Sequence, residues 1–146
     1  MPCKEVGKRA VNRKEIAAFA YRFKKGNLEI MLVTNRDRSR WILPKGQPEA
    51  HLSDEDVALM EAYEESGLIG ELDKRYASQE IVMQTSRGIV TMHVYVVRIK
   101  KLLSKWPEKS FRKRNLVDID TAIAHIDKQP LRECIVQLAK AVSPPG

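Results

Sequence analysis

The stretch from residue 46 to residue 68 constrains the fold of this chain more than any other segment does. Ser53 is a good N-cap, because its side-chain oxygen can accept a hydrogen bond from an amide of the first helical turn. The three acidic residues at 54–56 place negative charge at the positive end of the helix dipole. Gly67 can adopt the left-handed conformation that ends a helix. These signals predict one helix between Ser53 and Gly67.

Three carboxylates are predicted to share one face of this helix. Glu61, Glu64 and Glu65 are spaced at i, i+3 and i+4, which brings side chains together at about 100° per residue. Carboxylates this close repel one another unless a cation lies among them, and hard oxygen ligands suit Mg²⁺ or Mn²⁺. The alternative is an acidic helix face that is exposed to solvent and binds no metal. Leu59, Ala62, Tyr63 and Ser66 lie on the opposite side, and because two of them are large apolar groups we expect that side to contact the core.

The surroundings of these glutamates resemble the signature box of the Nudix hydrolases. That box reads Gly, five residues, Glu, seven residues, Arg-Glu, an apolar residue, any residue, Glu-Glu, any residue, Gly and an apolar residue. Residues 41–45 also look like the strand that leads into the box. The positions that fit in register over 23 residues are Gly46, Glu61, Ala62, Glu64, Glu65, Gly67 and Leu68.

Two positions depart from the box. Leu52 stands where the box has its first Glu, and Met60 stands where it has its Arg. Replacing both partners of a buried ion pair by apolar residues can be neutral or stabilising. Our hypothesis is therefore that Leu52 and Met60 pack together and that the three remaining glutamates still bind metal.

The second half of the chain is similar to the diphosphoinositol polyphosphate phosphohydrolases. The closest local match is the triplet Arg112-Lys113-Arg114, which precedes a helix start at residues 120–123. The large aromatic residue that follows the triplet in that branch is absent, with Leu116 in the region. The whole resemblance covers roughly residues 14–140.

The order of the elements and the resemblance lead to the same architecture. Strands, a helix, more strands and then helices indicate a mixed α+β topology. The resemblance implies a Nudix-type α/β/α sandwich with a central mixed β-sheet and an enzyme that hydrolyses phosphoric anhydrides. It further implies metal ligation by Glu61, Glu64, Glu65 and the Gly46 carbonyl, with Glu64 or Glu65 as the catalytic residue that takes the proton from the attacking water.

The composition fits one folded domain, which we assign to residues 1–146, with 1–12 and 143–146 as loose ends. The hydrophobic content of 43% is that of a globular protein. No apolar run reaches the roughly 18 residues of a membrane helix, and the basic start has no apolar stretch of a signal peptide behind it. Because Cys3 and Cys134 are the only cysteines, no disulfide framework is expected, and we predict a cytoplasmic location.

The net charge of +7 is concentrated in one segment. Residues 98–114 hold eight basic residues and one acidic residue, and this difference of seven equals the whole excess. Such a patch indicates a polyanionic partner, although a solubilising surface would look the same. Guanidinium forks suit phosphate oxygens. The candidate phosphate contacts are Arg38, Arg40, Lys45, Arg87, Arg112, Lys113 and Arg114.

The remaining elements are predicted from periodicity and turn residues. The turn at residues 24–27 should take its positive φ angles from Gly26 and Asn27. Asp120 or Thr121 is expected to cap a helix that ends near residue 126. The expected strands are 15–23, 28–34, 41–43, 77–84, 89–100 and 116–119, with a connector at 70–76 and a last helix at 131–142.

Several functions remain open at this stage. A metal-dependent pyrophosphohydrolase with a highly anionic substrate leads, and diphosphoinositol polyphosphates and diadenosine polyphosphates are its candidate substrates. A degenerate domain that binds a nucleotide or RNA without cutting it is the second hypothesis, supported by Leu52, Met60 and the basic segment. Removal of pyrophosphate from an RNA 5′ end is the third. Trp41 and Trp106 could stack on a base, with packing favoured for Trp41. The oligomeric state is left open.

Overall fold

The computed structural model of the chain describes residues 12–144. Cys3 and most of the predicted loose ends lie outside the described residues. Within these residues the elements are β1 (Arg13–Lys24), β2 (Asn27–Thr34), β3 (Trp41–Ile42), β4 (Lys45–Gly46), α2 (Asp54–Ser66), β5 (Leu68–Leu72), β6 (Gln79–Thr85), β7 (Gly88–Leu102), β8 (Arg114–Val117), α3 (Ile119–His125) and α4 (Gln129–Ala141).

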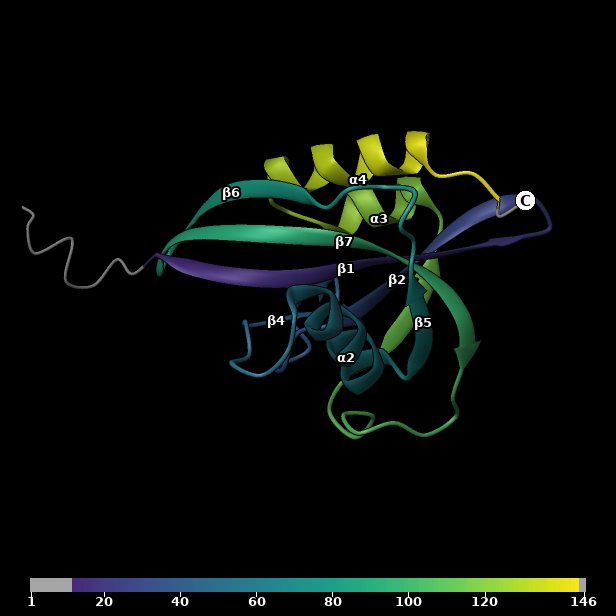
Figure 1. Cartoon of the computed structure of the whole chain (residues 1–146), viewed down its shortest axis with the longest axis horizontal. Helices are drawn as coiled ribbons and strands as arrows, with labels where there is room; N and C mark the ends of the chain where they lie inside the picture. Colours follow the sequence, from purple (N-terminus) through teal and green to yellow (C-terminus); the bar gives the residue numbers. More distant parts are fainter. Residues whose placement is uncertain (1–11, 145–146) are drawn as a thin grey trace, which may run out of the picture.

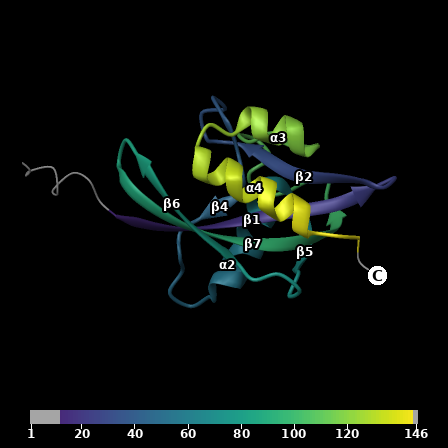
Figure 2. The ribbon, with the colours of Figure 1, turned by 90° about the horizontal axis from the view of Figure 1, so that it is seen from above.

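The strands form one mixed sheet between two helical layers. The order along the sheet is β3-β2-β1-β7-β5, with β4 paired to β1, β6 to β7 and β8 to β2. The pairing of β1 with β7 is parallel, and the other pairs are antiparallel. Helix α2 lies under the sheet and helices α3 and α4 lie over it (Figure 1). Seen from above, α4 runs across the strands (Figure 2). The α/β/α sandwich predicted from the sequence is therefore the architecture observed.

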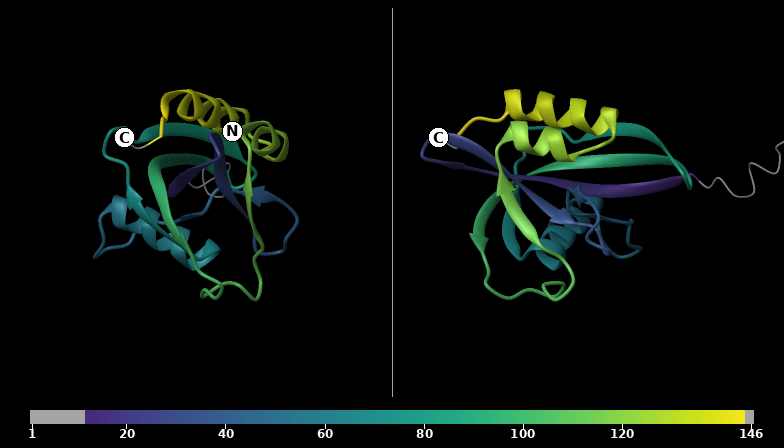
Figure 3. Two further views of the ribbon diagram at one scale, coloured as in Figure 1. Left: turned by 90° about the vertical axis from the view of Figure 1, so that its right-hand side faces the viewer. Right: turned by 180° about the vertical axis from the view of Figure 1, so that it is seen from behind.

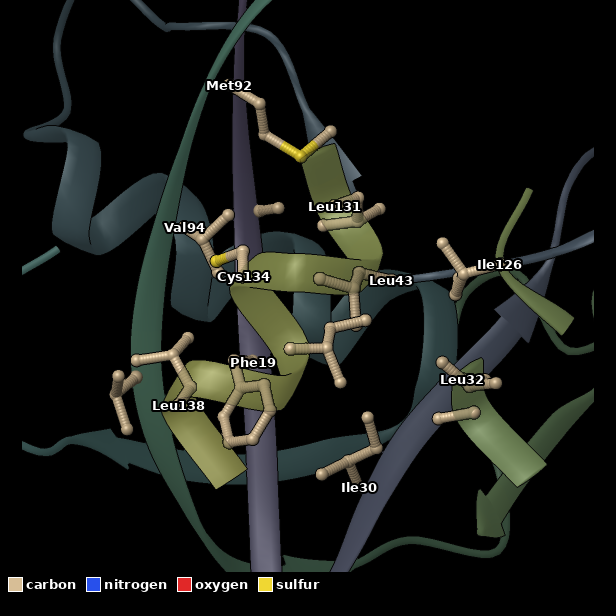
Figure 4. Packing of buried hydrophobic residues seen from close by; sticks show 14 of the residues in the cluster. Phe19, Ile30, Leu32, Leu43, Met92, Val94, Ile126, Leu131, Cys134 and Leu138 are labelled. Atoms are coloured by element: carbon tan, nitrogen blue, oxygen red, sulfur yellow. The ribbon is translucent and has the colours of Figure 1, made fainter. Parts of the chain in front are cut away.

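Strand β1 has an apolar core on each of its two faces. Successive side chains of a strand point to opposite faces, so alternate residues of β1 enter different cores. Ile16 and the β1 residues at every second position after it pack with Val57 and Ala58 of α2. Phe19 and the β1 residues two positions before and after it pack with Cys134 and Leu138 of α4. Figure 4 shows Phe19 beside these two residues. A strand buried on both faces requires a nearly continuous apolar sequence, and the segment from 16 to 21 supplies it.

The side of α2 that faces the sheet is only partly the side predicted. Ala62 and Ser66 are buried as expected, but Tyr63 was also expected in the core and 38% of it is exposed. The helix is rotated so that small residues, including Ala58 and Ala62, face the sheet and let the helix approach β1 closely. This rotation also turns Glu65 inward, where it is only 4% exposed. The hydrophobic contrast of α2 is weak, so the two sides were difficult to distinguish from the sequence.

Two local predictions also need correction. In the β1–β2 turn the positive φ angles belong to Lys25 (53°) and Gly26 (81°), not to Asn27, because a two-residue hairpin loop needs them at both central positions. Helix α3 is capped by Asp118, whose side chain accepts from the Thr121 amide. The predicted cap at Asp120 or Thr121 therefore lay two to three residues too late.

Two further segments predicted as irregular are strands. The connector expected at residues 70–76 includes most of β5, which pairs with the second half of β7. Residues 44–46 were expected to end a strand, but Lys45 and Gly46 form β4 and pair with β1. Both segments are short and contain glycine, so their own sequence carries little strand signal and the partner strand decides their conformation. In the described residues no helix is both long and apolar enough to cross a membrane.

A buried polar network closes the end of the sheet beyond β5. The Tyr21 hydroxyl donates to Asp73 Oδ2 at 2.5 Å, and Arg75 Nη2 donates to the same oxygen at 2.9 Å. Arg75 also donates to the Ser143 carbonyl at 3.1 Å, which ties down the segment after α4. The Arg75 and Tyr21 hydrogen bonds lower the pKa of Asp73 to about 2, and burial raises the pKa of Tyr21 to about 12.

Asp73→Asn should lower the free energy of unfolding at neutral pH by about 2 kcal/mol, because the folded state depresses the pKa of this buried carboxyl. A depressed pKa stabilises the folded state above the unfolded value of 3.8, and this stability is lost as the pH falls toward 2. Urea unfolding should therefore separate the variant from the unchanged protein at pH 7 and much less at low pH. Asp127→Asn, which breaks an exposed pair with Arg40, is the control. An equal loss at both pH values would contradict the assignment.

Candidate active site on helix α2

The helix that carries the acidic face begins and ends as the sequence predicts. Ser53 Oγ accepts from the Asp56 amide at 3.1 Å. Gly67 has φ 71°, and its amide donates to the Tyr63 carbonyl at 2.8 Å. These two caps define α2 over Asp54–Ser66. They also fix which residues lie in its last two turns, where the three glutamates are.

The three glutamates line a single cavity of roughly 630 Å³. The predicted metal ligands Gly46, Glu61, Glu64 and Glu65 therefore come together. Three of the seven predicted phosphate contacts, Lys45, Arg87 and Arg112, lie there too. The other lining residues are Glu15, Asn35, Arg36, Ile42, Gln47 and Glu108.

Strand β4 approaches α2 so closely that a side chain at position 46 would displace the Glu61 carboxylate. Ile16 pairs with Gly46 and Ala17 pairs with Lys45, which places β4 at the edge of β1. A Cβ atom on Gly46 would overlap the Glu61 carboxylate. The absence of a side chain at this position therefore leaves room for Glu61 beside the backbone of β4.

Glu65 is buried and contacts one hydrogen-bond donor and one ion-pair partner. Its Oε1 accepts from the Lys45 amide at 3.2 Å, and its Oε2 lies 3.3 Å from Arg112 Nη2. Burial raises the pKa of Glu65 to about 8, although Arg112 opposes the shift. Burial and the nearby charges of Glu64 and Glu108 raise the pKa of Glu61 to about 7. The site therefore holds carboxylates that are costly to ionise without further positive charge.

The donor set fits a hard divalent cation in its chemistry. Several carboxylates and the carbonyl-bearing backbone of Gly46 surround one cavity, and such oxygen donors are those that Mg²⁺ and Mn²⁺ prefer. In the described residues, however, the carboxylates do not converge as a ready three-ligand cluster. Glu65 already has partners in this structure, since its Oε2 lies beside Arg112 and its Oε1 accepts from the Lys45 amide.

Glu108 is a site residue that the sequence analysis did not propose. It lines the same cavity as the helix glutamates, and its Oε1 accepts from Arg112 Nε at 2.5 Å. Its amide donates to the Glu64 carbonyl at 3.0 Å, so the backbone also holds it against α2. One signal could have found it, because Glu108 is the single acidic residue in the basic segment 98–114.

The loop before β8 is fastened to the C-terminal end of α2. Trp106 Nε1 donates to the Glu65 carbonyl at 3.1 Å, and Arg114 Nη1 donates to the Ser66 carbonyl at 2.8 Å. The Arg114 guanidinium also stacks on the Trp106 ring at 4.1 Å. Figure 3 shows this long loop reaching below the sheet beside α2. Trp106 is thus packed between the helix and cations, and the loop holds Glu108 and Arg112 toward the cavity.

The remaining predicted phosphate contacts lie outside this cavity. Arg114 supports the end of α2, and Lys113 is exposed. Arg38 donates to the Ser110 carbonyl at 2.9 Å, so it joins two loops. Arg40 pairs with Asp127 at an exposed position. Their positions differ from the prediction because loop contacts, which the sequence does not encode locally, determine where these side chains point.

A second cavity of roughly 470 Å³ adjoins the first. The two share Glu15, Ile42, Lys45 and Arg87. Buried apolar side chains form the floor of the second cavity: Leu43, Met83, Val90 and Met92. Its lining also includes Trp41 and the cations Arg13, Arg40, Arg87 and Lys128. The Trp41 ring stacks on His125 and packs against the core, as its sequence context predicted.

The hypothesis that Leu52 and Met60 pack together gains no support. Leu52 is 39% exposed, and neither residue joins the apolar clusters of the described chain. Neither residue lines the cavity of the glutamates. The two departures from the box therefore lie outside that cavity.

Relatives found by sequence are Nudix hydrolases. The chain is 28% identical over 127 residues to Nudix hydrolase 21, chloroplastic, of Arabidopsis thaliana, covering 84% of this chain and 64% of that protein. It is 27% identical over 113 residues to mouse diphosphoinositol polyphosphate phosphohydrolase 3-alpha, covering 76% and 67%. The chain spans less than two thirds of the length of the Arabidopsis relatives Nudix hydrolase 21 and Nudix hydrolase 4. No family model matches.

Solved structures show the same fold at low sequence identity. An Ap4A hydrolase of C. elegans superposes with a TM-score of 0.74 at 14% identity, covering 91% of this chain and all of that chain. The Nudix domain of Shewanella oneidensis NrtR, solved with ADP ribose, gives a TM-score of 0.70 at 15% identity, covering 91% and 90%.

The fold is that of the Nudix hydrolases. The comparisons confirm the predicted resemblance, including the diphosphoinositol polyphosphate phosphohydrolase branch, and the predicted fold class. They confirm as well the class of enzyme that the chain is similar to, one that acts on phosphoric anhydrides. The cytoplasmic location stays a prediction.

Gly46→Ala should weaken Mn²⁺ binding about tenfold or more, because the added methyl group displaces the Glu61 carboxylate. Free Mn²⁺ measured by electron paramagnetic resonance during a titration gives the affinity. Glu61→Gln should cause a similar loss, and the double variant should lose little more than either single variant, because both act on one carboxylate. Unchanged affinity in Gly46→Ala would show that Glu61 does not bind the ion.

Proposed function

We propose that the chain is a divalent-metal-dependent pyrophosphohydrolase that cleaves a P–O–P bond in a highly anionic substrate. The observation that carries the proposal is one cavity in which Gly46 and the three glutamates of α2 face Lys45, Arg87 and Arg112. Hydrolysis of a phosphoric anhydride needs positive charge on the phosphate oxygens, a positioned water and a base. This cavity places candidates for these tasks within one space.

Each group has a proposed role in that reaction. Glu61, Glu64, Glu65 and the Gly46 carbonyl would hold Mg²⁺ or Mn²⁺, which when bound supplies Lewis-acid activation of the phosphate and of water. Arg87 lies on the border between the two cavities, where it can bind a phosphate group that spans them. Glu64 or Glu65 would accept the proton of the attacking water.

The second cavity supports a choice between the two candidate substrates. Its floor is apolar and its rim is basic, which suits a ligand with a flat apolar group next to phosphates. A nucleobase has such a face, whereas an inositol ring substituted with phosphates does not. We therefore favour a nucleoside polyphosphate, such as a diadenosine polyphosphate, over a diphosphoinositol polyphosphate. The relatives found by sequence include diphosphoinositol polyphosphate phosphohydrolases, and an Ap4A hydrolase is among the similar structures, so the assay below includes both substrates.

A binding module without hydrolysis is the second candidate. One observation favours it: in the described residues Glu65 is engaged by Arg112 and the carboxylates are not gathered as a metal site. Exposed lysines on the loop before β8 add a basic surface for RNA. Binding of this kind should weaken steeply with salt and should survive loss of a carboxylate.

Glu61→Gln should reduce Mg²⁺-dependent hydrolysis by at least about a hundredfold, because the lost charge supports the ion in the transition state. The assay measures phosphate or nucleotide release from diadenosine polyphosphates, a diphosphoinositol polyphosphate, nucleoside diphosphate derivatives and 5′-triphosphorylated RNA. Glu55→Gln, an identical change on the exposed first turn of the same helix, should retain full activity. If no substrate is hydrolysed and salt-sensitive RNA binding persists in both variants, the binding module is the correct function.

Arg87→Ala should raise the KM for the preferred substrate about tenfold, with a smaller change in kcat, because a charged contact to a phosphate outside the reacting bond is lost. Steady-state kinetics on the substrate identified above gives both constants. Lys24→Ala, at the far end of the β1–β2 hairpin, removes a cation outside either cavity and should change neither constant. A fall in kcat alone would place Arg87 at the reacting phosphate instead.

A further inference from the structure

Arg112 is the most deeply buried cation of the cavity, with 7% of the residue exposed. Its guanidinium makes three contacts: Nη1 donates to the Thr34 carbonyl at 2.8 Å, Nε donates to Glu108 Oε1 at 2.5 Å, and Nη2 lies 3.3 Å from Glu65 Oε2. One side chain thus joins the end of β2, the loop before β8 and the last turn of α2. The contact with Glu65 is the longest of the three.

The charges in the cavity are unevenly paired. Lys45 donates to Glu15 at 3.1 Å, and Arg112 forms ion pairs with both Glu65 and Glu108. In the part of the chain that the structure describes, no ion pair reaches Glu61 or Glu64. Arg112 therefore provides the positive charge beside the buried Glu65 and the partly buried Glu108.

We propose that Arg112 is a built-in counter-cation that competes with the divalent ion for Glu65. Without the ion, Arg112 Nη2 lies beside Glu65 Oε2. When an ion binds at the acidic face, Glu65 turns to it and Arg112 keeps its contacts with Glu108 and Thr34. The inference rests on the proposed function, because it assumes that Glu65 is a metal ligand. Arg112 acts through Glu65 and is therefore a positioning residue.

The geometry favours such an exchange over simple structural support. The two shorter contacts hold the guanidinium in place whether or not Glu65 is present. The longer contact with Glu65 is the one that can be given up at least cost. Two cations near one carboxylate repel each other strongly at low effective dielectric constant, so the ion and the guanidinium should not share Glu65 on equal terms.

Removal of Arg112 should tighten metal binding, whereas a purely structural role predicts that its removal weakens binding. We expect the Kd of Mn²⁺, measured by electron paramagnetic resonance without substrate, to fall about tenfold in Arg112→Gln. Arg112→Lys, which keeps the charge, should stay near the unchanged protein. Arg114→Gln is the matched control, since it removes a guanidinium that also fastens the loop to α2 but lies outside the cavity.

A second measurement uses the unchanged protein and so does not depend on the folding of a variant. The side-chain Nε–Hε resonance of Arg112, identified by its loss in Arg112→Lys, should shift in nuclear magnetic resonance spectra as Mg²⁺ is added. The Arg114 resonance should move far less. An Arg112 resonance that is insensitive to saturating Mg²⁺ would overturn the proposal.

The outcomes separate this inference from the proposed function. If the unchanged protein binds no Mn²⁺ at millimolar concentrations, the metal-dependent function fails and the inference fails with it. If the unchanged protein binds Mn²⁺ but Arg112→Gln binds it equally or more weakly, only the inference is overturned. Equal tightening in Arg112→Gln and Arg114→Gln would also overturn it, because the cause would then be a loosened loop.

Discussion

The burial of β1 on both faces is the constraint on which the rest of the structure depends. Six consecutive residues, 16–21, are almost fully buried, and alternate side chains enter two separate cores. Helix α2 must cover one face, and helices α3 and α4 must cover the other. Because β4 pairs with this same strand, the position of β1 also sets the distance between Gly46 and Glu61. The geometry of the site therefore follows from the way in which α2 and β4 pack on β1.

The carboxylates can lie together in this cavity because two separate segments bring positive charge to it. Lys45 comes from β4 on one side, and Arg112 comes from the loop before β8 on the other. That loop is held by Trp106 and Arg114, which donate to carbonyls at the end of α2. These donors also satisfy orphan carbonyl groups at the negative end of the helix dipole. The same contacts thus end the helix and place the cation beside its buried glutamate.

Features that depend on neighbours in the sequence could be predicted, and features that depend on distant partners could not. The caps of α2 and the long β6–β7 hairpin are local, and the structure has them where the sequence indicates. Tyr63 was misplaced because the rotation of α2 follows the small residues that pack on β1 and the contact between Glu65 and Arg112. Strand β5 was missed because its pairing with β7 outweighs the weak strand preference of its own residues.

The candidate site divides in the same way. The glutamates and Gly46 are recognisable because their spacing along one helix and its entry loop is fixed. Arg112 was grouped with Arg114 as a phosphate contact, since nothing in a basic triplet distinguishes a buried guanidinium from one that supports a helix end. The difference arises from distant partners: Arg112, in the loop before β8, donates to the Thr34 carbonyl, whereas Arg114, at the start of β8, donates to the Ser66 carbonyl. Met60, where the box has its arginine, lies outside the cavity, and the guanidinium beside Glu65 comes from 52 positions further along the chain than Met60. The charge that the acidic face requires is therefore a property of the folded chain and not of its signature segment.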